Sequence, residues 1–348
     1  MRVYAGMSDR VGLRDVIPYA QRVEALGYDG LHVPETVHDG LAASLLALEH
    51  TTRLTVRTSV VLAFPRSPML TAYGAWDLAA FSDGRFQLGL GTQIKQNVVG
   101  RFSVPWTDPV HRMREYVESL RAIWHSFQTG EPLHYEGRNY TFTRLQPFFN
   151  PGPLPDGSTP PSIWLGGVNE GMVSLAGSHA DGIVTHPTNS NPRYLREICL
   201  PALGPDLRPG FQIVSGSQYI TGPSQADVDR NREHHRRLLA FLYSTPPYRR
   251  TLTLHGWDDL GERLQAITRT QAWDTLHEHV TDEVLDALLP QATWDELPAV
   301  IDAWFGDLCD GVILPLPEDP ANDDRFSDVI AEVQRLGRSS GTRLPGVV

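Results

Sequence analysis

Ionisable side chains close the stretch GYDGLHVPETVHD, residues 27–39, where Glu35, His38 and Asp39 follow a short apolar run. Imidazole titrates near neutral pH and a neighbouring carboxylate can orient it. Glu35 and His38 therefore have the residue types of a general acid–base pair. A histidine at a strand end is also common as a purely structural residue, so both interpretations stay open at this point.

A second candidate stretch is WLGGVNEGM, which contains Gly166, Gly167, Val168 and Asn169. Adjacent glycines let a phosphate approach the backbone, and the first N–H groups of a following helix favour an anion. Asn169 is a suitable N-cap for a helix that begins near Glu170. A tight turn would need the same glycines for steric reasons, so a phosphate site and a plain turn are both possible.

GLGTQ, residues 89–93, is a third candidate. Thr92 and Gln93 could hydrogen-bond the edge of a flat heterocycle, or they could cap the next helix. The chain contains no GxGxxG, GxxxxGK[ST], GxSxG or HExxH motif, which argues against a dinucleotide fold, a P-loop, a serine hydrolase elbow and a zinc helix. The thirteen histidines define no metal site, so we expect none.

Composition limits the class of partner. The chain has 30 basic and 41 acidic residues, a formal net charge of −11, which disfavours nucleic acid or a membrane surface and favours a small-molecule partner. Cys199 and Cys309 have no metal or disulfide spacing. With neither an apolar run of membrane length nor a signal-like start, we expect a cytoplasmic protein.

Four Asp-Gly pairs, beginning at residues 29, 83, 181 and 310, each separate a helix-like segment from an apolar run. The helix-like segments are 13–26, 69–81, 171–180 and 297–308, and a glycine after each can take the positive φ that ends a helix. Strands are predicted near 2–5, 30–33, 55–62, 86–90, 162–165, 182–185, 211–219 and 311–314. Eight strands alternating with helices predict a (β/α)8 barrel, with an open doubly wound sheet as the alternative.

Two regions interrupt this alternation of strands and helices. Residues 129–161 are rich in proline and aromatics and read as an inserted loop or hairpin after the fourth helix. Residues 225–308 read as extra helices before the eighth strand. Neither region looks like a linker, so we predict a single domain over 1–348.

In a parallel barrel the functional loops leave the carboxyl ends of the strands. This rule gathers the candidate stretches at one rim, with Thr185 and His186 after the sixth strand and Gln218 and Tyr219 near the seventh. The Asp-Gly turns lie at the opposite, stabilising end.

The quoted stretches, together with RTSVVLAFPRSPMLTAYGAWDLAAFSDGRFQLGLGTQ, MREYVESLRAIW, YEGRNYTF and IWLGGVNEGMVSLAGSHADGIVTHP, resemble the luciferase-like monooxygenase superfamily. The resemblance is greater to its branch of oxidoreductases that depend on the deazaflavin coenzyme F420. It covers most of residues 1–200 in the expected order. It implies a (β/α)8 barrel with the coenzyme across the carboxyl face.

The resemblance also implies site residues. The ring would lie at a non-proline cis peptide between Ser59 and Val60. Gly91, Thr92 and Gln93 would flank the ring, and residues 166–169 would hold the phosphate. The expected substrate-lining side chains are Phe64, Trp106, Phe148, Phe149, His186 and Trp257.

The chain departs from the sugar-phosphate dehydrogenases of that branch. Glu35-Thr36 stands where they carry an Asp-His pair, and Gln93 or Ile94 stands where they carry a glutamate. Lys95 is the only lysine, so a basic sugar-phosphate pocket is not expected. Arg66, Arg101 and Arg193 are candidates for contact with the polyglutamyl tail of F420.

We therefore expect an F420-dependent oxidoreductase that transfers a hydride to or from a small, mostly uncharged substrate, with His38 delivering a proton and Glu35 orienting it. An FMN-dependent, oxygen-using monooxygenase is the alternative, and a cofactor-binding protein without turnover is a second one. A homodimer is expected from the resemblance alone.

Overall fold

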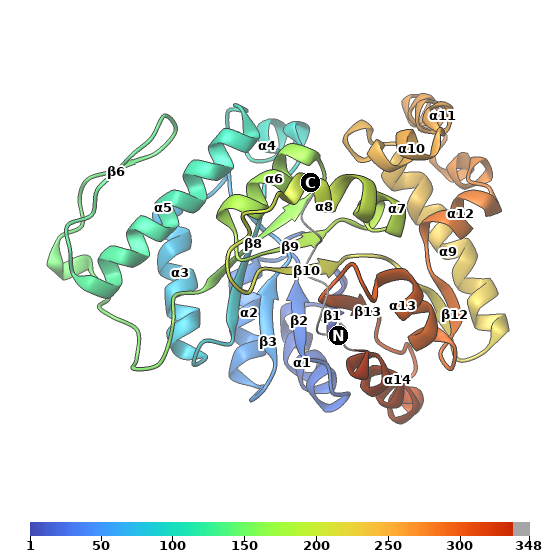
Figure 1. Cartoon of the computed structure of the whole chain (residues 1–348), viewed down its shortest axis with the longest axis horizontal. Helices are drawn as coiled ribbons and strands as arrows, with labels where there is room; N and C mark the ends of the chain where they lie inside the picture. The colour runs from blue at the N-terminus through green and yellow to red at the C-terminus, as the bar shows by residue number, and fades with distance from the viewer. Residues whose placement is uncertain (337–348) are drawn as a thin grey trace.

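The computed structural model describes residues 1–336 and shows a closed parallel barrel surrounded by helices (Figure 1). The strand order is β3-β2-β1-β13-β10-β9-β8-β5, and pairing of β3 with β5 closes it. β4 continues β3 after a short break, so the barrel has eight strand positions. The strands are β1 Arg2–Gly6, β2 Gly30–Val33, β3 Thr55–Thr58, β4 Val61–Leu62, β5 Phe86–Gly91, β8 Ser162–Gly167, β9 Gly182–Thr185, β10 Gln212–Ser215 and β13 Gly311–Leu314.

Helices cover the outside of this sheet, as the alternation along the chain predicted. They include α1 Val16–Ala25, α2 Gly40–Glu49, α3 Pro68–Phe81, α5 Pro109–Thr129, α6 Glu170–His179, α8 Leu200–Leu203, α13 Leu297–Phe305 and α14 Asp323–Arg335. The barrel prediction is confirmed, and the open sheet is excluded because β3 and β5 pair in register.

Alternate residues of each strand face the helices or the barrel interior. The helix-facing set is aliphatic and fully buried, for example Val3, Leu31 and Leu88. The interior carries a separate apolar cluster of Tyr4, Trp164, Val184 and Val214, with Ile313 packed against it. The barrel is therefore a filled core rather than a channel.

Carboxylates of the Asp-Gly pairs fasten neighbouring strands at the amino-terminal end of the barrel. Asp29 Oδ2 accepts from Val3 N at 2.8 Å. Asp181 and Asp310 repeat this contact with the N–H groups of Ile163 and Ile213, the second residues of β8 and β10, at 2.7 and 2.8 Å. The pairs thus act as strand staples, in agreement with a stabilising role for that end.

The reason expected for their glycines is wrong at three of the four pairs. Only Gly84 has a positive φ, 79°, whereas Gly30, Gly182 and Gly311 do not. A Cβ at Gly182 would overlap the Trp164 ring, and one at Gly30 or Gly311 would press on Tyr4. Glycine is needed there because two large rings fill the barrel interior.

The insertion over 129–161 contains the predicted hairpin, formed by β6 Tyr135–Glu136 and β7 Thr141–Phe142. It projects from the α5 side of the barrel (Figure 1). The buried Glu115 carboxylate of α5 accepts from the hairpin N–H groups of Arg138 and Asn139 at 2.7 and 2.6 Å. Its turn is therefore anchored to the outside of the barrel.

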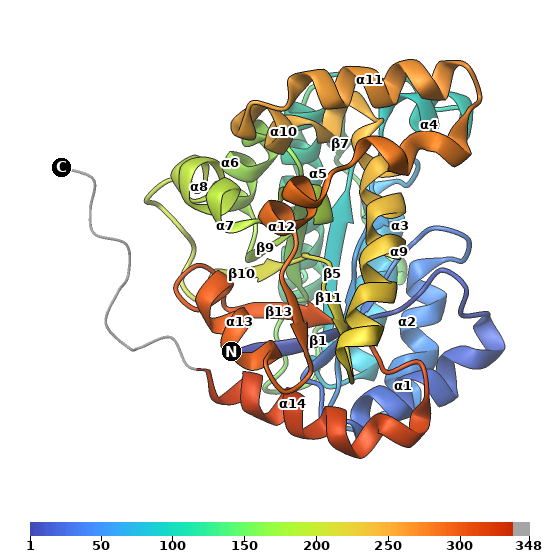
Figure 2. The same ribbon diagram turned by 90° about the vertical axis from the view of Figure 1, so that its right-hand side faces the viewer.

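An excursion between β10 and α13 contains the extra helices that the sequence predicted. Its elements are β11 Ile220–Gly222, α9 Gln225–Tyr243, α10 Arg250–His255, α11 Asp258–Arg269, α12 Asp282–Leu288 and β12 Gln291–Thr293. Figure 2 shows α10 and α11 across one end of the barrel, with α1 and α14 at the other. The excursion has its own apolar cluster, including Leu239, Leu264 and Leu285.

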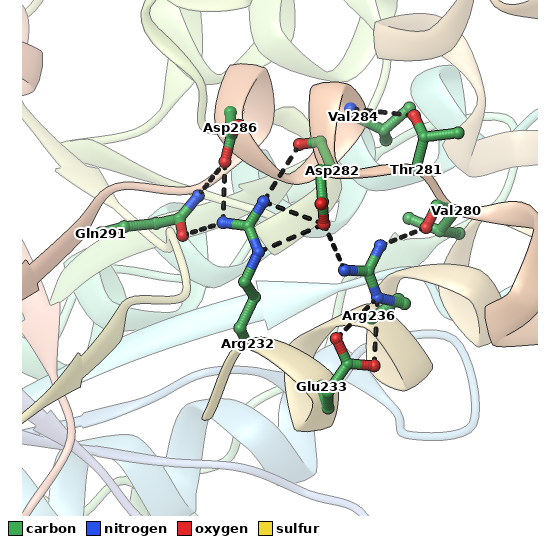
Figure 3. Close-up of polar contacts among 9 residues, drawn as sticks. All are labelled: Arg232, Glu233, Arg236, Val280, Thr281, Asp282, Val284, Asp286 and Gln291. Atoms are coloured by element: carbon green, nitrogen blue, oxygen red, sulfur yellow. Dashed lines mark hydrogen bonds and ion pairs between the residues drawn. The ribbon is translucent and has the colours of Figure 1, made fainter. Parts of the chain in front are cut away.

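A polar clamp of Arg232, Arg236, Asp282, Asp286 and Gln291 ties α9 to α12 and β12 (Figure 3). Arg236 binds the Asp282 carboxylate and donates to the carbonyl oxygen of Val280. Arg232 lies 2.7 Å from Asp286 and also binds Gln291. The clamp holds one face of α9 against α12 and β12, and this also fixes the direction in which the opposite face of α9 points.

One predicted strand has the wrong extent. The range 211–219 is broken, because β10 ends at Ser215 and β11 leaves the barrel to pair with β12 in a separate parallel pair. β12 was not predicted, since three residues between helices are too few for a periodic pattern.

Candidate functional site

The carboxyl ends of the strands form a mouth with few side chains. The uppermost interior position is glycine on four strands: Gly6, Gly91, Gly166 and Gly216, the last just beyond β10. One interior position lower on the same strands stand Tyr4, Trp164 and Val214, and a further glycine, Gly89, on β5. A flat ligand can therefore descend into the top of this barrel until it reaches the large side chains.

The third strand bulges at this mouth. Arg57 pairs with Gln87 and Val61 pairs with Leu90, so the third strand uses one more residue than β5 over the same span. The Ser59–Val60 peptide is cis, as the resemblance implied. Ser59 and Val60 are half-buried and face the mouth.

Val60 lies across the glycines of the two next strands. A Cβ at Gly91 would overlap Val60 Cγ2, and a Cβ at Gly166 would lie 3.2 Å from Val60 Cγ1. The close approach of Val60 thus requires glycine at position 91 and leaves little room for a side chain at 166. Val60 forms an apolar shelf at the mouth. The shelf is where the resemblance puts the ring.

Below the shelf, Thr58 supports the bulge. Its hydroxyl donates to the Gly89 carbonyl and accepts from the Gly89 N–H, both at 2.9 Å. A Cβ at Gly89 would strike the Thr58 carbonyl. One side chain thus replaces two ladder hydrogen bonds where the strand leaves its regular register.

The turn after β8 has the predicted cap. Asn169 Oδ1 accepts from Met172 N at 3.0 Å at the start of α6. Gly166 is half-buried at the mouth, whereas a Cβ at Gly167 would point outward and lie 2.8 Å from Ile183 Cδ1. The two glycines therefore differ: Gly166 keeps the mouth open, and Gly167 lets α6 pack against β9.

Contacts from other loops fix the same turn. The Val168 carbonyl accepts hydrogen bonds from the Asn189 amide and, at 3.3 Å, from the Tyr194 hydroxyl. Thr251 of α10 donates to Asn189 Oδ1 at 2.9 Å. The excursion therefore contacts the candidate phosphate turn through one amide side chain.

The loop after β5 places Thr92 and Gln93 near the mouth, both half-buried. Gln93 has a positive φ of 62°, which is uncommon outside glycine. Its side chain accepts from Ile94 N at 2.9 Å, and Thr92 Oγ1 donates to the Gln93 carbonyl at 3.0 Å. These bonds lie within the loop and cap no helix, since α4 has Ile94 as its N-cap and no side-chain cap hydrogen bond. The capping alternative is therefore not supported, and the loop stays beside Gly91.

Glu35 does not orient His38. One Glu35 oxygen accepts from Leu62 N at 2.7 Å, and the other binds Arg66, which also binds Asp39 at 2.7 Å. No hydrogen bond between Glu35 and His38 is present in residues 1–336. The expected pair is therefore corrected, because strand 3 and its following loop, rather than His38, provide the partners of Glu35. His38 is half-buried, and it directly precedes Asp39 in the sequence.

Arginines proposed for the coenzyme tail already have protein partners. Arg66 holds two carboxylates, Arg101 donates to the Thr36 carbonyl at 2.8 Å, and Arg193 pairs with Glu197 at 3.0 Å. All three keep exposed surface, so contact with a tail stays a prediction.

The predicted substrate-lining residues divide into three places. Phe64 and Trp106 pack edge to face, with ring centroids 6.1 Å apart, after the third strand. Trp257 stacks on His255 in the excursion at 4.7 Å. Phe148 and Phe149 are 91% and 53% exposed on a segment bonded to the outside of α3, so their positions give no support to a lining role.

His186 lies at the end of β9 and stacks on Tyr248 of the excursion, with centroids 4.4 Å apart. Its Nδ1 lies 2.8 Å from the Thr188 hydroxyl. Burial lowers the pKa of His186 to about 4, so the ring is neutral at physiological pH. A neutral ring favours stacking and hydrogen bonding over ionic contact.

A cavity of about 780 Å³ extends from the mouth beneath the excursion. It reaches Gly6 and Ile313 and runs along β11 and α9. Since β1, β13 and β10 stand opposite β8, β5 and β3 in the strand order, the cavity lies across the barrel from the Val60 shelf. Its polar lining includes Ser217, Gln218, Thr221, Asn231, His234 and His235.

Sequence reasoning missed a polar cluster inside the barrel. Arg57, fully buried, contacts Gln87, His32 and Tyr4, and its guanidinium lies 3.2 Å from the Trp164 ring centroid. The signal was present: His32 and Arg57 interrupt the buried runs LHV and TVRT at interior positions. No group of three or more metal-ligating side chains occurs in the described part of the chain.

The fold defines a class, the (β/α)8 barrels, here with a glycine-lined mouth at the carboxyl ends of the strands. Within this class, the family model of luciferase-like monooxygenases matches residues 2–310. The chain belongs to the luciferase-like monooxygenase family, as its motifs indicated.

Among relatives, uncharacterized protein Rv1360 of Mycobacterium tuberculosis is 38% identical over 300 residues, covering 84% of this chain and 86% of the relative. The 5,10-methylenetetrahydromethanopterin reductase of Archaeoglobus fulgidus is 25% identical over 290 residues, covering 80% and 82%. Both matches extend over most of each chain.

Solved structures share the fold. The coenzyme F420-dependent tetrahydromethanopterin reductase of Methanopyrus kandleri superposes with a TM-score of 0.77 at 16% identity, covering 96% of this chain and 98% of that one. The oxygenating constituent of 3,6-diketocamphane monooxygenase of Pseudomonas putida, in complex with FMN, gives 0.62 at 16% identity, covering 97% and 98%. These likenesses show a shared fold, and the family match makes this chain a member of a family of oxidoreductases.

Proposed function

We propose that this protein is a coenzyme F420-dependent oxidoreductase acting on a small, mostly uncharged organic substrate. The observation that carries the proposal is the mouth, where Val60 forms an apolar shelf over glycines 91 and 166 and the turn at 166–169 starts a capped helix. A flat ring joined to a phosphate has this shape. The reductase relatives named above favour the deazaflavin.

The residues fit such a coenzyme. A Cβ at Gly91 or Gly166 would close the space beside Val60. The first backbone N–H groups of α6 suit a phosphate, because Asn169 satisfies only Met172 N. When bound, F420 supplies or accepts two electrons and a proton as a hydride.

We assign the proton to His38. In the reducing direction, a carbonyl carbon of the substrate would receive the hydride and its oxygen would receive a proton from His38, giving an alcohol. Glu35 has a different role, since it holds Leu62 N and Arg66 and so supports the shelf. Val60 and the buried Phe64 exclude water from the ring side of the mouth.

The cavity beneath the excursion is our proposed substrate side. Among its lining residues Arg230 is the only lysine or arginine, and it binds Asp227. Lys95 lies elsewhere, on α4 Lys95–Gly100. The remaining charged lining residues are the carboxylates Asp227, Glu318 and Asp319, and the other polar groups are hydroxyls, amides and imidazoles, a lining that suits an uncharged polar substrate better than a sugar phosphate.

The test is a paired titration of the purified protein with F420 and with FMN, followed by fluorescence and absorbance. F420 should bind more tightly, and reduced F420 should be oxidised when a carbonyl substrate is added. Tight binding of FMN alone, with oxygen consumption, would replace the proposal with a monooxygenase. Tight F420 binding without turnover of any tested substrate would indicate a binding protein.

A homodimer is also proposed. Exposed apolar side chains gather on α3 and the adjoining 147–149 turn: Leu70, Phe81, Phe148 and Phe149. Sedimentation of the wild type and of Phe148→Asp tests this, with a shift to monomer expected for the variant. We also propose a cytoplasmic location, as expected from the sequence. No helix within residues 1–336 is long and apolar enough to cross a membrane.

A further inference from the structure

A buried positive charge without a carboxylate partner stands inside the barrel. Arg57 is 0% exposed, and no Asp or Glu of residues 1–336 forms an ion pair with it. Its contacts are neutral: Gln87 Oε1 accepts from Nε at 2.7 Å and from Nη2, and His32 Nε2 lies 3.0 Å from Nη1. Buried charges are normally paired, so this cation needs an explanation.

The surroundings add to the positive character of the cluster. His32 must accept through Nε2, because Arg57 can only donate, so its proton is on Nδ1. Nδ1 is buried and has no hydrogen-bond partner in the described chain. Burial, and secondly the neighbouring Arg57 cation, lowers the pKa of His32, which stays neutral. The cluster therefore presents an unmatched cation and an unmatched donor.

Arg57 lies directly below the mouth. It is two residues before Ser59 on the third strand, and its Cγ lies 3.7 Å from the position a Cβ would take at Gly89. The next interior position of β5 is Gly91, so no side chain of β5 separates the cluster from the Val60 shelf. Two residues of strand span about 7 Å.

We propose that Arg57 is a fixed positive charge that stabilises negative charge on the ring of a redox carrier bound at the Val60 shelf. This inference rests on the proposed function and deepens it. Arg57 is fully buried and acts through the interior field, so it is a positioning charge and touches no reacting atom. The reduced ring of a deazaflavin or flavin becomes anionic when a ring nitrogen loses its proton, and that form would bind best.

The expected size follows from distance. A unit charge about 10 Å away, at an effective dielectric constant near 20, changes a binding equilibrium by about tenfold. The pKa of the bound reduced carrier should then lie about one unit below its value without the charge. Arg57 itself stays protonated at pH 7, since burial lowers its pKa only to about 10.

Gln87→Glu is the sharpest test. The change is isosteric and puts a carboxylate on Arg57 Nε and Nη2, so it neutralises the charge without removing the side chain. Gln212→Glu is the matched control, because Gln212 is another half-buried interior glutamine near the amino end, on β10 across the barrel. The assay measures the affinities for oxidised and reduced carrier, and the pH titration of the bound reduced carrier by absorbance.

Gln87→Glu should reduce the preference for the reduced carrier about tenfold and raise the bound carrier's pKa by about one unit, whereas Gln212→Glu should change both much less. Arg57→Gln should act like Gln87→Glu, and Arg57→Lys should retain the preference. Because the preference is the ratio of the affinities for reduced and oxidised carrier in the same variant, any general damage to the fold affects both affinities and cancels. An unchanged ratio in Gln87→Glu, or an equal change in Gln212→Glu, would overturn the inference.

If wild-type protein binds neither F420 nor FMN, the proposed function fails. The melting temperatures of the ligand-free proteins then test whether the charge of Arg57 is uncompensated. An uncompensated Arg57 predicts that Gln87→Glu melts at a higher temperature than both wild type and Gln212→Glu, because a buried cation gains a partner. A lower melting temperature would mean that the charge is already balanced, and the inference would be rejected.

Discussion

Gly166 and Gly167 are adjacent and chemically identical, yet the structure predicts opposite results for their alanine variants. A Cβ at Gly166 would lie 3.2 Å from Val60 Cγ1 in the half-open mouth, where a shift of a few tenths of an ångström relieves it. Gly166→Ala should therefore change the free energy of unfolding by less than about 1 kcal/mol. The new methyl group occupies ligand space, so carrier affinity should fall about tenfold or more.

Gly167→Ala is the matched control. Its Cβ would lie 2.8 Å from Ile183 Cδ1 and 3.2 Å from Val173 Cγ2, both in the core between β9 and α6. Overpacking of this kind costs about 1–3 kcal/mol. The variant should melt several degrees lower while binding the carrier normally when folded.

Thermal melting followed by circular dichroism, and carrier titration by fluorescence, give both quantities for each variant. If Gly166→Ala binds the carrier as wild type does, the mouth beside Val60 is not the binding surface. If Gly167→Ala loses affinity without losing stability, the outward assignment of that glycine is wrong.

Three further predictions concern other elements. His38→Ala should slow turnover at least tenfold with little change in carrier affinity; equal turnover would remove His38 from the reaction. The lowered pKa of His186 means that the folded protein binds fewer protons than the unfolded chain between about pH 4 and 6.5, so stability should fall as the pH drops through that range, and His186→Asn should flatten the dependence in acid melting curves. Arg236→Ala should speed hydrogen exchange in residues 280–288 more than in the barrel strands, because it breaks the clamp of Figure 3; uniform exchange would mean that the clamp adds nothing local.

The barrel was predictable because its signals are periodic and local. Buried strands and Asp-Gly joints recur along the chain, and the staples at Asp29, Asp181 and Asp310 show why those joints are acidic. The short β12 was missed because its pairing with β11 joins residues about seventy apart and leaves no local pattern.

The site was predictable only in part. Motif resemblance predicted the cis peptide between Ser59 and Val60, and residue types predicted the helix cap at Asn169; at both places the backbone itself is the feature. Side-chain partnerships were harder, because Glu35 has an arginine and a backbone N–H from another strand as partners, and sequence proximity suggested His38 instead. Phe148 is 91% exposed, and since aromatic residues in a loop can face solvent as well as a ligand, its lining role stays a prediction.

Arg57 and His32 show a third limit. Each is one polar residue in an apolar run, and only the closed barrel reveals that their interior positions meet. Strand parity could have placed them on one face, but not against Trp164, which lies more than a hundred residues later in the chain.

The strand staples have a practical consequence for engineering. Three carboxylates fasten neighbouring strands at the floor of the barrel, whereas the shelf, the turn and the cavity lie at its rim. The residues that stabilise the fold and the residues proposed to contact the ligand thus lie at opposite ends of the barrel. Libraries that randomise rim positions such as Gln218 and His234 should yield mostly folded proteins, so new specificities can be selected in this scaffold without first stabilising it.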